Sequence, residues 1–107
     1  MSPLADPEDL DEATRVINAY VANDWCQISF SDHARERIAE RQIPNDVITQ
    51  ALQVGRVVGV RVEVFKDRLT YKYEVEMIDR YGRVTVITAI PRSQRLHIVT
   101  VYTDIPD

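Results

Sequence analysis

The chain has 107 residues, enough for one hydrophobic core but too few for two ordinary domains. Hydrophobic residues make up 45% and charged residues 28%, a composition typical of a globular protein and not of a disordered one. No apolar run is long enough to span a membrane, and the N-terminus lacks the basic and apolar regions of a signal peptide. Cys26, the single cysteine, cannot form an intramolecular disulfide and has no partners for a metal cage. We therefore expect a reduced, cytoplasmic protein that binds neither a metal nor a cofactor.

The net charge of −4 is unevenly distributed along the chain. Residues 1–27 carry a net charge of −5, residues 28–102 carry +3, and residues 103–107 carry −2. A mildly basic body behind an acidic leader could bind an anion through the body. The overall acidity argues against a general nucleic-acid-binding protein.

Two or three helices are expected in residues 7–54. The first covers residues 7–22, with Asp6 as its N-cap, Pro7 at the first helical position and apolar residues at helical spacing beyond them. A short extended piece, Gln27-Ile28-Ser29-Phe30, leads to the second helix, which runs from residue 31 or 32 to about residue 41. A third begins near residue 45 and ends before Gly55, which suits a helix C-terminus.

After Gly55 the hydrophobic period changes from helical to alternating. The alternating runs lie at residues 58–64, 69–77, 83–90 and 95–103. Connections of three to five residues require neighbouring strands to be antiparallel. We therefore predict an α+β fold with a single domain over residues 1–107, in which the helical part packs on one face of a four-stranded antiparallel sheet formed by residues 56–103.

The second predicted helix combines an apolar stripe with a basic one. His33, Arg37 and Arg41 lie four residues apart and share one stripe, while Ala34 and Ile38 form an apolar stripe beside it. An imidazole can transfer a proton near neutral pH, and guanidinium groups match the geometry of phosphate oxygens. This pattern therefore predicts a site for an anionic ligand on the second helix. The alternative is that both arginines pair with nearby acids, among them Glu36, Glu40, Glu74 and Glu76, and that His33 bonds a nearby backbone group.

The last predicted strand, at residues 95–103, has two polar residues on the same face as its buried apolar residues. Strict alternation places Thr100 and Tyr102 on the face that also carries Leu96 and Ile98, and their hydroxyls there need hydrogen-bond partners. The arginines of the second helix could provide them. The same alternation turns His97 to the opposite face, where we expect a surface residue.

Several motifs resemble those of a small-domain family of unknown function. They are Ile28-Ser29-Phe30-Ser31, His33-Ala34-x-x-Arg37-x-x-x-Arg41-x-Ile43, Asp46-Val47, Ala51-Leu52-x-x-Gly55 and Val99-Thr100-Val101-Tyr102. This family looks related to the BrnT and RelE group of small metal-independent ribonuclease toxins. The resemblance covers about residues 10–102 and implies a RelE-like or barnase-like arrangement of helices on an antiparallel sheet. It also implies that His33 and Arg37 hold the leading polar positions, that Lys72, Thr100 and Tyr102 complete the site, and that a cognate antitoxin or immunity protein is the partner.

These observations favour a metal-independent endoribonuclease. Cleavage of RNA without a metal needs a base for the 2′-hydroxyl, cations for the phosphorane and an acid for the leaving oxygen. We assign His33 as base or acid and Arg37 with Arg41 as the phosphate clamp. Lys72 would add positive charge, and Thr100 or Tyr102 would fix the phosphate. The alternatives are a non-catalytic module on the same fold that binds RNA or an acidic protein, and a structural or phage- or plasmid-borne interaction protein.

Overall fold

The computed structural model describes residues 3–79 and 82–104, and over these residues it has three α-helices and one five-stranded mixed sheet. The elements in chain order are α1 (Leu10–Val21), β1 (Gln27–Phe30), α2 (Asp32–Arg41), α3 (Asn45–Val54), β2 (Arg56–Phe65), β3 (Arg68–Asp79), β4 (Gly82–Arg92) and β5 (Arg95–Asp104). The strand order in the sheet is β1-β5-β4-β3-β2. The predicted α+β class is confirmed, and so are the four long strands and their antiparallel pairing.

The prediction of a four-stranded, wholly antiparallel sheet is wrong, because β1 adds a fifth strand that pairs in parallel with β5. Gln27 aligns with Arg95 and Phe30 with Ile98, so β1 covers only the first half of the outer edge of β5. A strand of four residues is too short to show a clear alternation. Its partner lies almost 70 positions further along the chain, so no local turn signals the pairing.

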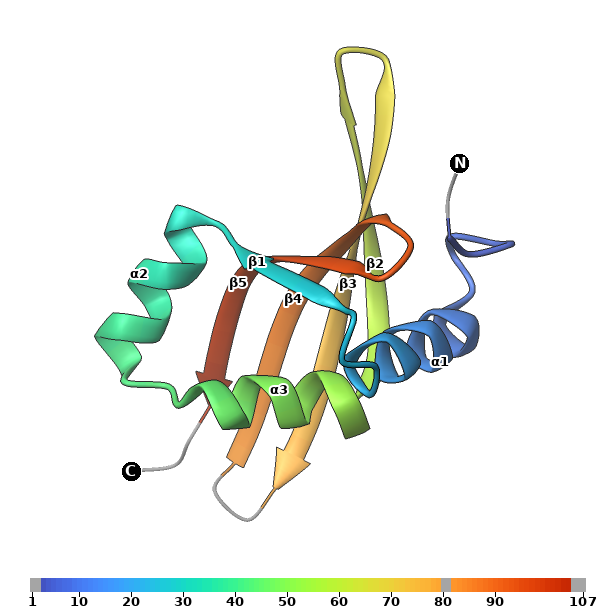
Figure 1. The fold of residues 1–107 in the computed structure, drawn as a ribbon. Helices are drawn as coiled ribbons and strands as arrows, with labels where there is room; N and C mark the ends of the chain where they lie inside the picture. Colours follow the sequence, from blue (N-terminus) through green and yellow to red (C-terminus); the bar gives the residue numbers. More distant parts are fainter. Residues whose placement is uncertain (1–2, 80–81, 105–107) are drawn as a thin grey trace.

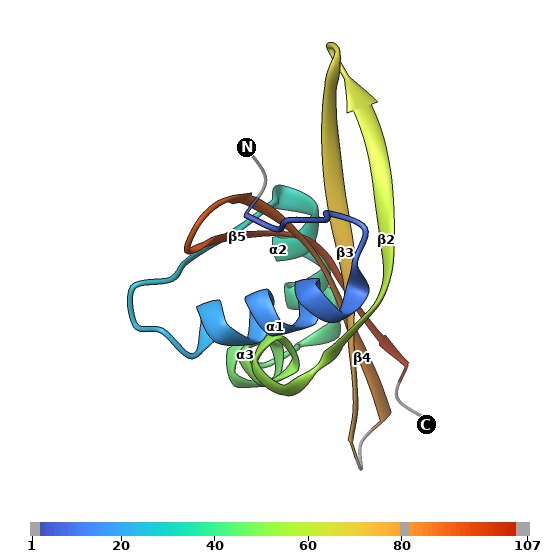
Figure 2. The same ribbon diagram turned by 90° about the vertical axis from the view of Figure 1, so that its right-hand side faces the viewer.

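The helices occupy one face of the sheet and one of its edges (Figure 1). α1 packs on β2 and α3, and α3 packs on β3 and β4, so these two helices cover the same face. α2 packs instead against β5, where it continues along the edge that β1 leaves free. Seen from the side, the opposite face of the sheet has no helix on it over the described residues, and the β2–β3 hairpin projects beyond the helices (Figure 2). This projection accounts for the longest dimension of the molecule, 41 Å.

The first helix begins later than predicted. The carboxylate of Asp9 accepts hydrogen bonds from the backbone N–H groups of Asp11 and Glu12, both at 3.1 Å, so Asp9 is the N-cap. The carboxylate of Asp6, the predicted cap, accepts instead from the backbone of Glu8 within the preceding turn. Two Asp-x-x-acid sequences follow each other here, and the helix begins at the second one, Asp9-x-x-Glu12.

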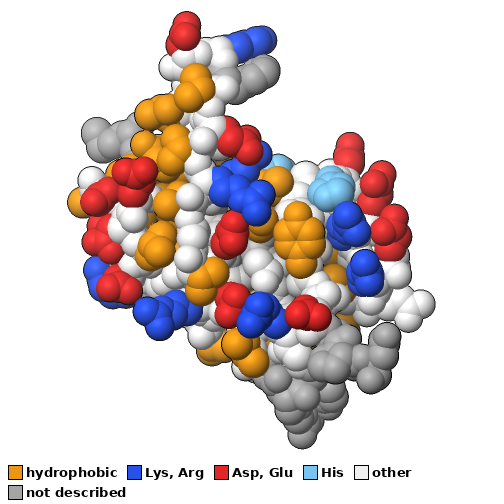
Figure 3. Space-filling model, turned by 180° about the vertical axis from the view of Figure 1, so that it is seen from behind, with side chains coloured by type: hydrophobic (Ala, Val, Ile, Leu, Met, Phe, Trp, Pro, Cys, Tyr) orange, Lys and Arg blue, Asp and Glu red, His pale blue; other side chains and the backbone are white. Residues whose placement is uncertain are grey.

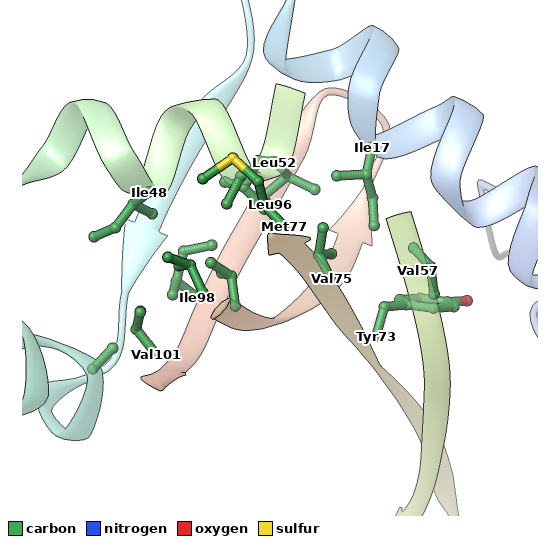
Figure 4. Packing of buried hydrophobic residues seen from close by; sticks show 14 of the residues in the cluster. Ile17, Ile48, Leu52, Val57, Tyr73, Val75, Met77, Leu96, Ile98 and Val101 are labelled. Carbon is green, nitrogen blue, oxygen red and sulfur yellow. The ribbon is translucent and has the colours of Figure 1, made fainter. Parts of the chain in front are cut away.

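The core lies between α1, α3 and the covered face of the sheet (Figure 4). Ile17 from α1, Leu52 from α3 and Val75 from β3 are all fully buried there. Two side chains of α1 fix this helix to its neighbours. The amide of Asn18 donates to the carbonyl oxygens of Leu52 and Gly55, at the end of α3, at 2.7 and 3.2 Å. In the second turn of α1, the hydroxyl of Thr14 accepts a hydrogen bond of 2.9 Å from the backbone N–H of Val57 in β2.

Candidate functional site

The start of α2 is bonded directly to β5. Ser31 is the N-cap, and its hydroxyl accepts from the N–H of Ala34 at 3.0 Å while donating to the carbonyl oxygen of Val99 at 2.6 Å. The backbone N–H of Ser31 also donates to the carbonyl of Ile98 at 2.9 Å. One hydroxyl group can donate once and accept at the same time, so Ser31 both begins the helix and attaches it to the strand. The first turn of α2 therefore lies beside residues 98–100 of β5.

The predicted stripe of α2 is present as a run of open basic side chains. The helix covers His33, Arg37 and Arg41, and it buries Ala34 completely while Ile38 packs against the core. His33 and Arg41 are exposed, and Arg37 is half-buried. Because residues four apart share a face, these three side chains follow the length of α2, which packs against β5.

These basic side chains have no acidic partner within residues 3–79 and 82–104. The ion pairs of this part of the chain all lie on the sheet, where Arg61 pairs with Glu74 at 2.9 Å and Arg83 with Glu76 at 3.6 Å. Glu74 and Glu76, two of the acids that could have neutralised α2, are therefore already paired with strand arginines. The charge of Arg37 and Arg41 remains available to an external anion.

A β-bulge changes which residues of β5 share a face. Ile98 pairs with Thr88 of β4, whereas Thr100 pairs with the next residue, Ile87, so Val99 is the extra residue of the bulge. The predicted alternation is consequently wrong beyond residue 98. Val101 joins Ile98 in the core, as Figure 4 shows, and Thr100 turns to the open face of the sheet.

His97 lies on the face opposite Leu96 and Ile98, as predicted, and the bulge brings Thr100 and Tyr102 to that same face, contrary to the prediction for these two residues. It aligns with Ala89, and Thr100 aligns with Ile87, two residues on the same side of β4. The Nδ1 atom of His97 shares a hydrogen bond of 2.8 Å with the hydroxyl of Ser29 on β1. No local pattern of residues indicates this Ser–His pair, because it depends on the pairing of β1 with β5.

The two hydroxyl residues differ in their surroundings. Thr100 is only 5% exposed, and its Oγ1 atom is buried with no hydrogen-bond partner among the described residues. Tyr102 is 45% exposed, so its phenol ring lies at the surface near the end of β5. Figure 3 shows this face of the molecule, with acidic and basic side chains interspersed over the strands and a histidine with basic side chains on the α2 side. Because the Oγ1 atom of Thr100 is covered by its neighbours, a ligand at the surface does not reach it in this structure, whereas the phenol of Tyr102 is open to one.

Lys72 lies apart from the other predicted site residues. It is on the open face of β3, and its ammonium group forms an ion pair of 2.7 Å with Glu63. Two strand spacings, about 10 Å, separate β3 from β5, and α2 lies on the far side of β5. The structure thus brings His33, Arg37 and Arg41 alongside the strand of Thr100 and Tyr102, and it does not bring Lys72 to them.

Other features of the described residues do not add a reactive group to this site. Cys26 is half-buried, and burial raises the pKa of its thiol, so it is a poor nucleophile. Residues 3–79 and 82–104 contain no cluster of three side chains able to hold a metal ion. No helix in these two ranges is long and apolar enough to cross a membrane. Two of the best-formed surface hollows lie elsewhere, one at the base of β2 and one beside Tyr73.

Residues 30–103 match a family model described as "Domain of unknown function (DUF4258)". The chain belongs to the DUF4258 family. The matched segment begins at Phe30 and therefore includes α2, α3 and the four long strands, with all the predicted site residues, but not α1. Searches of curated proteins and of solved structures give no match to this DUF4258 protein.

Proposed function

We propose that the protein is a metal-independent endoribonuclease of the toxin type, with its site along the α2–β5 edge. The observation that supports this proposal is the row of basic side chains of α2 that have no acidic partner among the described residues, placed beside the strand that carries the exposed phenol of Tyr102. Arg37 and Arg41 provide positive charge for a phosphate, and His33 provides a group that can transfer a proton. The resemblance to the BrnT and RelE group agrees with this combination and with helices packed on an antiparallel sheet.

The reaction needs only side-chain chemistry. His33 removes the proton of a 2′-hydroxyl, whose oxygen attacks the adjacent phosphorus. Arg37 and Arg41 stabilise the charge that develops on the non-bridging oxygens. The predicted contact of Thr100 with the phosphate has no step here, because its Oγ1 atom is buried. The bond from phosphorus to the 5′-oxygen then breaks, and the exposed phenol of Tyr102 supplies the proton that this oxygen takes up. The products are a 2′,3′-cyclic phosphate and a free 5′-hydroxyl.

Lys72 has no step in this scheme, because its charge is paired with Glu63 and it lies two strands away from β5. A toxin of this kind is held inactive by a protein partner, so an antitoxin or immunity protein that covers α2 is part of the proposal.

A second candidate is a non-catalytic module that binds RNA or an acidic protein at the same edge. The exposure of His33 and Arg41 favours it, because catalytic groups usually line a recess that excludes water. Both candidates use His33, Arg37 and Arg41, which we call the α2 stripe, and they differ only in whether bound RNA is cut.

Incubation of purified protein with several RNAs in excess EDTA separates the two. Cleavage is expected to persist without metal, and a deoxynucleotide at the cleaved position is expected to block it. His33→Ala should lower the rate by about 10²- to 10⁴-fold, the usual effect of losing a general acid or base. Arg37→Ala should also slow cleavage, whereas Arg35→Ala, an exposed arginine off the stripe, should change little.

Circular dichroism spectra that match wild type would show that these variants are folded. Cleavage that is unchanged in His33→Ala would overturn the assigned chemistry. An absence of cleavage in all RNAs, together with binding that Arg37→Ala weakens, would instead support the binding module.

A further inference from the structure

β2 is an edge strand with a free side. It is the last strand in the order β1-β5-β4-β3-β2, so no described strand pairs with its outer edge. The β2–β3 hairpin, which we call the arm (residues 59–74), projects beyond the helices in Figures 1 and 2. Long exposed edges are templates on which another strand can pair. Charged side chains and bulges usually protect them, and the register shift between the described residues of β2 and β3 lies at the base, between Val57 and Gly59.

The turn of the arm determines which backbone groups face outward. Lys66 and Asp67 form a two-residue turn with φ angles of 49° and 62°, and Phe65 aligns with Arg68 across it. In such a hairpin the residues that flank the turn exchange both backbone hydrogen bonds, and bonded and non-bonded pairs then alternate. The N–H and C=O groups at positions 60, 62 and 64 therefore point away from β3, towards the free edge.

The sequence of this edge is complementary to itself. It reads Val60-Arg61-Val62-Glu63-Val64. If a second copy pairs antiparallel about Val62, each Val60 meets a Val64, and each Arg61 meets a Glu63. The same alignment joins the outward backbone groups of positions 60, 62 and 64 in about six hydrogen bonds. Arg61 and Glu63 then form non-bonded pairs, the type in which facing side chains lie closest.

The charged side chains of the edge have room for a second partner. Arg61 pairs with Glu74 at 2.9 Å and Glu63 pairs with Lys72 at 2.7 Å, yet the side chains of Arg61 and Glu63 remain 59% and 54% exposed. Pairing two copies would continue these contacts into a row of alternating charge across both arms. On the other face of the arm, Val62 and Val64 are exposed by 43% and 70%, and pairing would cover part of this apolar surface. Hydrophobic side chains are visible along the arm in Figure 3.

From the Arg61–Glu63 match and the outward backbone groups of positions 60, 62 and 64 we propose that the partner of the β2 edge is a second copy of this chain, paired antiparallel about a twofold axis at Val62. The two five-stranded sheets then form one continuous sheet. The α2 stripe lies at the opposite edge of each sheet and stays open in the pair. The inference therefore does not depend on the proposed function.

Two charge reversals test the proposal. Arg61→Glu places Glu against Glu at both contacts, and Glu63→Arg places Arg against Arg. Analytical ultracentrifugation should show a concentration-dependent dimer for wild type, and each variant alone should weaken dimerisation by about tenfold or more. An equal mixture of the two variants should recover dimers as heterodimers, because each contact then joins one acidic and one basic side chain.

The mixture also controls for folding and for contacts within each chain. Both variants lose an ion pair of their own arm, and the mixture does not restore that loss. Arg35→Glu and Glu36→Arg make the same charge changes at residues of α2, and neither they nor their mixture should alter dimerisation. A monomeric wild-type protein at about 1 mM, or variants that dimerise as well alone as mixed, would overturn the proposal.

Cysteine pairing reads out the register in a Cys26→Ser background. Arg61→Cys mixed with Glu63→Cys should form a disulfide-linked heterodimer under mild oxidation, because facing non-bonded positions lie about 4.5 Å apart between Cα atoms. Each cysteine variant alone should crosslink at least tenfold more slowly. Equal crosslinking of Arg61→Cys with itself would contradict antiparallel pairing about Val62.

Discussion

Replacing Ser31 tests whether α2 is attached to β5 as the structure indicates. Ser31→Ala removes the N-cap bond to Ala34, which is worth about 1 kcal/mol in most proteins. It also removes the 2.6 Å bond to the carbonyl of Val99, worth about another 1 kcal/mol. We therefore expect the free energy of unfolding to fall by about 2 kcal/mol, which corresponds to a decrease in Tm of about 10 °C for a chain of this length.

Chemical denaturation followed by circular dichroism measures this change. Ser31→Thr keeps a hydroxyl that can both donate and accept, so it should stay within about 0.5 kcal/mol of wild type. Ser29→Ala is a matched control two residues earlier, where the exposed hydroxyl bonds His97, and it should also cost less than about 0.5 kcal/mol. If Ser31→Ala were no more destabilising than Ser29→Ala, Ser31 would not be the link between helix and strand, and the site derived from it would fail.

Three further substitutions test the fold. Burial raises the pKa of Tyr73 to about 12, so the unfolded chain loses this phenolic proton first and the free energy of unfolding should fall between pH 10 and 12. Tyr73→Phe should remove this contribution to the pH dependence. Because it also loses the 2.7 Å bond to the carbonyl of Pro7, it should cost about 1 kcal/mol in urea denaturation at pH 7. Gln42→Gly should raise the free energy of unfolding by about 1 kcal/mol, because Gln42 ends α2 with a φ of 52°; a lower Tm would contradict this left-handed conformation. Gly55→Ala should cost about 2 kcal/mol or more, since a Cβ atom there would lie 2.1 Å from the carbonyl oxygen of Ala51, and a neutral result would show that α3 ends differently.

The long elements could be predicted from the sequence because their periodicity is repeated over many residues. Helical spacing in residues 45–54 and alternation in residues 68–79 each extend over several turns or pairs, and both predictions are confirmed. β1 has only four residues, and its pairing partner is determined by the tertiary fold. The extended conformation of residues 27–30 could therefore be predicted from the sequence, but their place in the sheet could not.

The site was predicted best where it depends on one helix. His33, Arg37 and Arg41 are fixed by helical spacing, and α2 has the expected start and end. The face on which Thr100 and Tyr102 lie depends on the register of β5, and a single bulge moves every later residue to the opposite face. Ile98, Val99 and Val101 are all apolar, so nothing in their pattern indicates that Val99 is the extra residue and that His97 shares a face with Thr100.

The central claim is that ligands bind along α2 and the second half of β5. The most direct test is a ¹H–¹⁵N chemical-shift titration with a short RNA that has 2′-O-methyl groups and therefore resists cleavage. We predict progressive shifts concentrated in residues 31–41 and 99–104, with little change near Lys72, and loss of these shifts in Arg37→Ala. Shifts centred on β2 and β3, or no shifts at millimolar RNA in low salt, would contradict the account.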